Sequence, residues 1–272
     1  MNQVFVNLGL GAVISTILVV VSIRSQNLTV SGGVGAIVIG TVIYGYGGWT
    51  WYGDLLAFFF SSSILTKVRY QAKAAKGVNE LKSGARTGWQ TIGTGGVAAF
   101  FAGVGLLFHG EPALLAAGFA GALAEANSDT WAVELGVLSK RNPRLITRIS
   151  SDVPPGTSGG ISSLGELSAI AGSLLVAFVA EALGVFRSAP LLLVTATAIA
   201  AVVAEHLDSV LGATVQAAYY CPQCHKETER KIHRCGARTR HVKGFEIMTN
   251  EAVNLVSTAI GATLAIILYI IL

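Results

Sequence analysis

The sequence contains few charged residues. Aspartate, glutamate, lysine and arginine make up only 12% of its 272 residues, and hydrophobic residues make up 52%, whereas a soluble globular domain carries about 25% charged residues. This deficit excludes a water-facing surface over a chain of this length. Mean hydropathy is +0.62, and the 32 glycines suit closely packed transmembrane helices. We therefore predict an all-α, polytopic membrane protein, with residues 1–272 forming a single integral membrane domain.

The chain also lacks the features of a cleavable signal peptide. Its first apolar segment starts almost at Met1, has no basic region before it and is followed by further apolar segments. We expect this segment to be the first transmembrane helix. Cysteine is scarce as well, and all three cysteines lie between residues 221 and 235. Thiol chemistry is therefore confined to one part of the chain.

Eight segments are long and apolar enough to cross a membrane, which takes roughly 20 mostly apolar residues. They cover residues 4–23, 28–44, 49–65, 89–108, 113–138, 164–185, 189–216 and 252–272. All lysines and arginines except Arg187 lie in the connections at residues 24, 67–86, 140–148 and 226–243. Because basic connections stay in the cytosol, we predict both termini outside and a cytosolic active site, in a membrane that we expect to be a prokaryotic plasma membrane.

Two of the predicted spans carry acidic side chains with polar neighbours. They are Glu125, Asn127, Asp129, Thr130 and Glu134 in residues 113–138, and Glu205, Asp208 and Ser209 in residues 189–216. Ionisable groups inside a span are costly and mark functional sites. Carboxylates beside hydroxyls suit Mg²⁺, and we predict that Asp129 and Asp208 bind it. The alternative is that these groups form hydrogen bonds between helices or line a wet crevice.

A loop rich in glycine, serine and threonine leads into the predicted span 164–185. It reads VPPGTSGGIS over residues 153–162. Such a loop before a helix N-terminus offers free backbone N–H groups and a positive dipole end, which together bind phosphate. We predict nucleotide binding at Pro155, Gly156, Thr157, Ser158, Gly159 and Gly160, with Arg144 and Arg148 as cations. The loop lacks the lysine of a Walker A motif, and a plain Pro-Gly turn with a helix cap is the alternative.

Two other predicted spans begin with polar residues. Arg86 and Gln90 lie where the span at 89–108 begins, and Asn250, Glu251 and Asn254 lie where the last span begins. Asn250 and Asn254 are four residues apart and share one helix face. We predict that these residues support the same cytosolic site. Ordinary positive-inside charge and polar helix packing are the alternatives.

The connection at residues 217–249 is predicted to be a cytosolic loop with a zinc site. It holds all the cysteines, in the order Cys221, Cys224, His225, His233 and Cys235. A Cys-x₂-Cys pair with a further cysteine and a histidine supplies four ligands for a closed tetrahedral zinc ion, and the reduced cytosol favours metal over disulfides. His233 is the simplest fourth ligand and His225 its rival. Unmetallated thiols are the alternative.

The central motifs resemble a known membrane family. The matching stretches are DTWAVELG at 129–136, PRLIT at 143–147, PGTSGGISSLG at 155–165, DSVLGATVQ at 208–216, the cysteine loop and NEAVN at 250–254. They resemble the family that includes transmembrane protein 19 and the plant phytyl-phosphate kinase of tocopherol synthesis, from about residue 28 to the C-terminus. The family often has aspartate where this chain has Glu251.

The resemblance implies a kinase that converts an isoprenyl monophosphate, such as phytyl or geranylgeranyl phosphate, to the diphosphate with a nucleoside triphosphate, CTP. Phosphoryl transfer needs positioning, Mg²⁺ and cationic side chains rather than an unusual nucleophile. We expect Glu125, Glu134 and Glu205 to support the magnesium ligands, and Arg86 to neutralise phosphate charge. The rival function is a secondary transporter or flippase for a lipid or small anion. Membrane lipid is an expected partner and nucleic acid is not.

Overall fold

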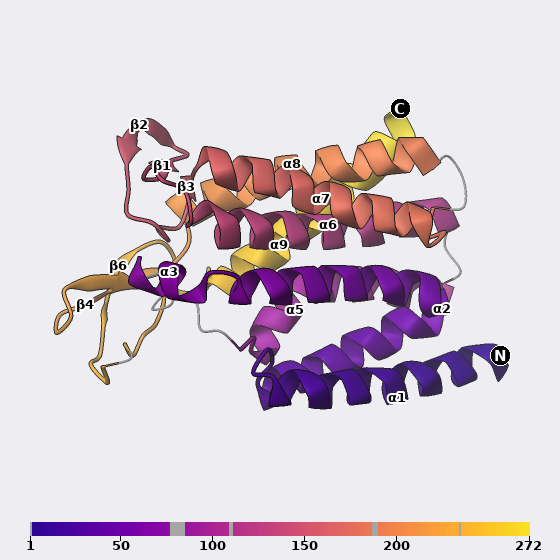
Figure 1. Ribbon diagram of the computed structural model, residues 1–272. Helices are drawn as coiled ribbons and strands as arrows, with labels where there is room; N and C mark the ends of the chain where they lie inside the picture. The colour runs from indigo at the N-terminus through magenta and orange to yellow at the C-terminus, as the bar shows by residue number, and fades with distance from the viewer. Residues whose placement is uncertain (1, 77–84, 109–110, 187–189, 234) are drawn as a thin grey trace.

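The computed structural model describes residues 2–76, 85–108, 111–186, 190–233 and 235–272. Arg187, the exception to the charge pattern, lies outside this part of the chain. The helices are α1 (Asn2–Arg24), α2 (Val30–Lys67), α3 (Tyr70–Ala75), α5 (Gly88–Phe108), α6 (Pro112–Gly136), α7 (Ser163–Ala182), α8 (Pro190–Thr214) and α9 (Asn250–Ile271). The long helices form one bundle (Figure 1), which confirms the predicted helical class.

Helix α6 is the central element of the bundle. It contacts α2, α5, α7, α8 and α9, and nearly all its residues from Ala113 to Ser128 are buried. A helix that is apolar on all sides is buried on all sides, and the small residues of α6 let its neighbours approach closely. An added Cβ on Gly121 would lie 2.7 Å from the Gly261 carbonyl oxygen of α9. The side chains that α6 carries are therefore held within the bundle.

Helix α2 contains two of the predicted spans. Gly48 in its middle has φ 56° and ψ −143°, a left-handed conformation that glycine adopts without steric cost. The two halves turn back on each other at this residue (Figure 1), and the rings of Tyr44 and Tyr52 meet edge to face at 5.4 Å. The predicted segments 28–44 and 49–65 are thus the two limbs of a helical hairpin.

Six of the described helices are long and apolar enough to cross a membrane, namely α1, α2, α5, α7, α8 and α9. The six count the α2 hairpin once. They leave out α6, which has 25 residues and is long enough to span a bilayer but carries Glu125, Asp129 and Glu134. Each of the eight predicted segments coincides with one of these helices or limbs to within a few residues. Eight crossings stay a prediction.

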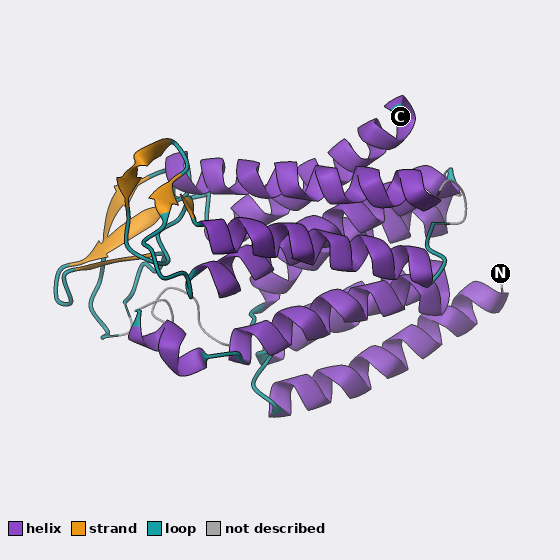
Figure 2. Cartoon of the chain, turned by 45° about the horizontal axis from the view of Figure 1, so that its top comes forward, coloured by secondary structure: helices purple, strands orange, loops and turns teal. Residues whose placement is uncertain are grey.

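Two small sheets cap one end of the bundle (Figure 2). The first joins β1 (Arg144–Leu145), β2 (Arg148–Asp152) and β3 (Gly160–Ile161) in the order β2-β1-β3. The second joins β4 (Ala218–Cys221), β5 (Lys226–Thr228) and β6 (Arg240–Lys243) in the order β5-β4-β6. The sequence predicts loops in both regions, because strands this short give no readable alternation of apolar and polar residues.

Both sheets and α3 lie at the end of the bundle opposite to the two chain termini (Figure 1). We call this the strand-bearing end. The connections at residues 24, 67–86, 140–148 and 226–243 contribute their described residues to this end, so the basic side chains share one side of the molecule. This is the arrangement that the charge pattern predicted.

Candidate active site

A polar cavity of about 100 Å³ opens at the strand-bearing end, between α6, α7, α8 and the first residue of α9. The residues predicted for the site that line it are Asp129, Pro155, Gly156, Thr157, Ser158, Gly159, Gly160, Glu205, Asp208, Ser209 and Asn250. They come from four separate segments of the sequence. The fold therefore brings both predicted magnesium ligands and the whole glycine loop to one place.

The acidic residues of the cavity lie within electrostatic range of one another. Asp208 Oδ2 accepts a hydrogen bond of 2.6 Å from Ser257 Oγ of α9. Glu125 lies one turn from Asp129 on α6 and is 1% exposed. Gly261 of α9 leaves room for the buried Glu125 side chain, because an added Cβ at Gly261 would lie 2.8 Å from the Glu125 Cβ. Negative charge is thus concentrated at the α6–α8–α9 junction.

Glu166 and His206 belong to the site but were not predicted. His206 Nε2 lies 2.9 Å from Glu166 Oε2, and His206 Nδ1 lies 3.3 Å from Glu205 Oε2. Glu166 and Glu205 both line the cavity. The available signal was His206 directly beside an intramembrane glutamate, with Glu166 in the first turn of α7. The imidazole joins two helices at the edge of the cavity.

Several predicted residues of α6 face other helices. Glu134 accepts hydrogen bonds from Lys73 Nζ at 2.6 Å and from Thr66 Oγ1 at 2.7 Å. Asn127 accepts from Ser61 and Ser62 of α2 and donates to the Gly172 carbonyl oxygen of α7. Thr130 donates to the Ala126 carbonyl oxygen of its own helix. Glu134 and Asn127 therefore join α6 to neighbouring helices, Thr130 bonds within α6, and none of the three lines the cavity.

The predicted arginines lie in different places. Arg144 and Arg148 are exposed on the first sheet, and Arg144 Nε lies 3.7 Å from Asp152 Oδ1. Neither lines the polar cavity. Arg86 is half-buried with its guanidinium 5.3 Å from the centre of the Phe58 ring. Burial lowers the pKa of Arg86, and the negative charges of Glu134 and Asp129 act in the opposite direction.

A second polar cavity of about 210 Å³ adjoins the first. Gln90, Asn250 and Glu251 line it, together with Arg230 and Lys231 of the second sheet region. Asn250 and Glu229 line both cavities. Asn254 lies one turn further along α9 and faces Gly93 of α5. The two polar cavities therefore lie side by side and share Asn250, at the start of α9, in their walls.

The glycine loop is held against α8 by close backbone packing. Gly159 has φ +80°, and an added Cβ would lie 2.5 Å from the Ala213 Cβ. Ser158 Oγ donates to Glu229 Oε1 at 3.3 Å and accepts from Gln216 Nε2 at 3.1 Å. Ser162 caps α7 by accepting from the Gly165 N–H. These contacts explain part of the glycine content by packing, and they connect the loop to the second sheet region.

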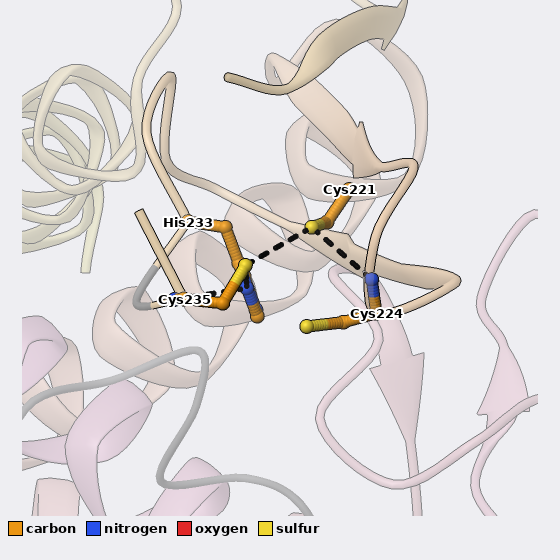
Figure 3. Close-up of side chains that lie close together, drawn as sticks. All are labelled: Cys221, Cys224, His233 and Cys235. Carbon is orange, nitrogen blue, oxygen red and sulfur yellow. Dashed lines mark hydrogen bonds between the residues drawn. The ribbon is translucent and has the colours of Figure 1, made fainter. Parts of the chain in front are cut away.

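The four predicted zinc ligands converge at one point beside β4 (Figure 3). The ligand atoms of Cys221, Cys224, His233 and Cys235 all lie within 4.8 Å of one another. The Cys221 and Cys235 sulfurs are 3.7 Å apart, close to the spacing of about 3.8 Å that two thiolates take on a tetrahedral ion with Zn–S bonds of about 2.3 Å. The rival, His225, contacts the Tyr220 hydroxyl instead.

The comparisons agree with this architecture. The model of the family described as integral membrane protein DUF92 matches residues 13–262. Protein PGR of Arabidopsis thaliana is 30% identical over 266 residues, covering 90% of each chain. An uncharacterized membrane protein of Synechocystis is 31% identical, covering 93% of this chain and 87% of its own.

A third relative is protein VTE6 of the Arabidopsis thaliana chloroplast, a phytyl-phosphate kinase. It is 26% identical over 249 residues, which cover 89% of this chain and 65% of VTE6. No solved structure matches the chain significantly. The predicted resemblance is confirmed: the chain belongs to the DUF92 family of integral membrane proteins, the family of the plant phytyl-phosphate kinase.

Proposed function

We propose that the protein is a membrane isoprenyl-monophosphate kinase, which makes a prenyl diphosphate from the monophosphate and CTP. The observation that carries the proposal is the polar cavity, which brings Asp129, Asp208 and the 155–160 glycine loop together. Carboxylates of this kind suit Mg²⁺, and a glycine loop before a helix N-terminus suits the phosphates of a nucleotide. Kinship with a phytyl-phosphate kinase supports the acceptor class.

In the proposed reaction, an oxygen of the acceptor monophosphate attacks the γ-phosphorus of the nucleotide. A new P–O bond forms to the prenyl phosphate, the bond between the γ-phosphorus and the β,γ-bridging oxygen breaks, and the nucleoside diphosphate leaves with that electron pair. The acceptor is already an anion, so no strong base is needed. The protein has to hold two anions in line and neutralise their charge.

The donor set of the cavity fits Mg²⁺. Asp129 and Asp208 would bind it, with the Ser209 hydroxyl and the Asn250 amide beside them, and hard oxygen ligands of this kind suit the ion. When bound, the ion would neutralise charge on the transferring phosphoryl group.

The position of the cavity supports an enzyme over a carrier. A secondary carrier binds its substrate near the middle of the bilayer with access from both sides. The cavity here lies at the strand-bearing end, beside the basic connections. We propose that this end faces the cytosol, where CTP is available, in the plasma membrane of a prokaryote.

The direct test is a transfer assay with protein purified in detergent, Mg²⁺, and geranylgeranyl or phytyl monophosphate. Each γ-labelled nucleoside triphosphate is supplied in turn. We expect label in the prenyl diphosphate, with CTP the best donor. Labelled product with ATP alone would keep the kinase and change its donor. No product with any donor, from folded protein, would contradict the proposal and make anion uptake into liposomes the next measurement.

We propose a structural zinc ion bound by Cys221, Cys224, His233 and Cys235. We expect about one zinc per chain in purified protein and about none in Cys221→Ser, measured by elemental analysis. Exposed His225 lies outside the cluster, so His225→Ala is the matched control and should keep the metal. Equal zinc in both variants would contradict the assignment.

Loss of the zinc should also lower transfer. The region that it holds contains Glu229, which binds Ser158 of the glycine loop and Gln216. Removing the zinc by chelation and then assaying the protein in excess Mg²⁺ should therefore show transfer slowed by about tenfold or more. The helical bundle should persist, which far-ultraviolet circular dichroism would monitor. Chelated protein with undiminished transfer would show that the loop does not depend on the metal.

A further inference from the structure

A third cavity lies apart from the two polar ones, between α1, both limbs of α2, and α5. Its volume is about 70 Å³. Apolar side chains make up most of its wall, including Leu18, Val19, Ile39, Leu55 and Phe59. The mechanism proposed above uses none of these residues. The polar cavities do not account for this apolar cavity. Its shape and charges indicate what kind of ligand it could bind.

The two ends of this apolar cavity differ. Ser15 and Tyr52 close the end nearer the chain termini, where the Ser15 hydroxyl and the Tyr52 hydroxyl lie 2.9 Å apart in a buried hydrogen bond. Gly40 packs against the same pair, because an added Cβ would lie 2.3 Å from Ser15 Oγ. Ser22 and Arg86 mark the other end. At 1.5 Å per helical residue, Ser15 and Ser22 of α1 are separated by about 10 Å along the axis.

The backbone of Arg86 is fixed at the strand-bearing end of the apolar cavity. The backbone N–H of Arg86 donates to the Asn27 carbonyl oxygen at 2.9 Å, and the backbone carbonyl oxygen of Arg86 accepts from the Thr29 N–H at 3.0 Å. In the described part of the chain, no acidic side chain lies within ion-pair distance of its guanidinium. Asp129 and Glu134 act on it from farther away. The side chain thus supplies positive charge to the wall of the apolar cavity, within electrostatic range of Asp129 and Glu134.

We propose that the apolar cavity binds the isoprenyl tail of the acceptor, with Arg86 binding its monophosphate. This inference rests on the proposed kinase function and adds a place for the acceptor. Charge complementarity carries it: a monophosphate dianion at the mouth would meet a guanidinium whose bidentate donors match phosphate. The buried Ser15–Tyr52 pair lies at the end of the cavity away from Arg86. A phospholipid acyl chain is the competing occupant.

A pair of phenylalanine substitutions on α2 tests the location. Ala36 lines the cavity, whereas Val38 on the same helix is 58% exposed and does not line it. In Ala36→Phe we expect KM for geranylgeranyl monophosphate to rise about tenfold, with a smaller rise for the shorter geranyl monophosphate. Val38→Phe should change neither value. Equal KM values in the two variants, with the wild type active, would overturn this inference and leave the kinase proposal standing.

Photolabelling tests the cavity independently of activity. A geranylgeranyl monophosphate with a diazirine near the end of its tail is irradiated with wild-type protein, and the labelled peptides are identified by mass spectrometry. We expect label on cavity-lining residues of α1, α2 or α5, competed by unlabelled prenyl monophosphate and reduced in Arg86→Gln. Competition by phosphatidylglycerol alone would identify a lipid site instead. Label confined to other helices would likewise overturn the assignment, whatever the transfer assay gives.

Discussion

Asp129→Asn should abolish prenyl diphosphate formation. The substitution keeps the size of the side chain and removes the charge of a predicted magnesium ligand that lines the polar cavity. A group that stabilises charge in the transition state contributes far more to the rate than to folding, so we expect kcat to fall about a thousandfold. Phosphoryl transfer depends almost entirely on such positioning and charge neutralisation. The measurement is single-turnover transfer from the labelled donor.

The matched control for this prediction is Asp152→Asn. Asp152 lies on β2 with its side chain 68% exposed, and its carboxylate lies 3.7 Å from Arg144 Nε. This variant makes the same chemical change at the same end of the molecule, and exposed ion pairs contribute little to stability. We expect it to keep full transfer. Full transfer in Asp129→Asn, from protein as stable as the wild type, would remove Asp129 from the mechanism.

Lys73→Met should be the most destabilising single change that we propose. Lys73 Nζ lies 2.6 Å from Glu134 Oε2, and the lysine side chain is 2% exposed. Methionine fits the space but leaves the Glu134 carboxylate without its cation. Breaking one half of a buried pair in this way costs about 3–5 kcal/mol. Thermal unfolding in detergent measures the loss, and α3, which carries Lys73, should become more accessible to protease.

Removing the second charge should restore much of that stability. In Lys73→Met with Glu134→Gln, no unpaired charge remains, and uncharged replacements of buried ion pairs are often nearly neutral. Exposed Lys67 donates to the Ser25 carbonyl oxygen, so Lys67→Met is a control that should change little. If the double variant is as unstable as Lys73→Met, packing rather than charge explains the effect.

Glu134 shows where sequence reasoning reached its limit. An intramembrane glutamate five residues from Asp129 on the same helix looks like a ligand of the same site. Its partner, Lys73, lies 61 residues earlier, and the sequence marked that lysine only as one of many basic residues in a connection. The side chains a residue meets across a bundle depend on helix rotation and spacing, which no local pattern specifies.

The glycine loop and Gly48 show a second limit of prediction from sequence. The glycine loop was predicted from composition, and it does line the cavity. Gly159, however, is required by its close approach to Ala213 of α8. Gly48 was not singled out, although its positive φ turns α2 into a hairpin. A glycine in the sequence indicates either an unusual backbone conformation or a close contact with another element. Only the residues around it in the structure show which of the two applies.

The sequence by itself determined the membrane class, the positions of the apolar segments, the common side of the basic connections, and the cysteine and histidine candidates for a zinc site. These follow from composition and short spacings, which act locally. The tertiary structure alone decided that Asp129 and Asp208 share a cavity, that Glu166 lines it with His206 beside it, and that Arg86 lines a separate apolar cavity. These arrangements arise from packing between helices far apart in the chain, where small residues determine how closely the helices approach.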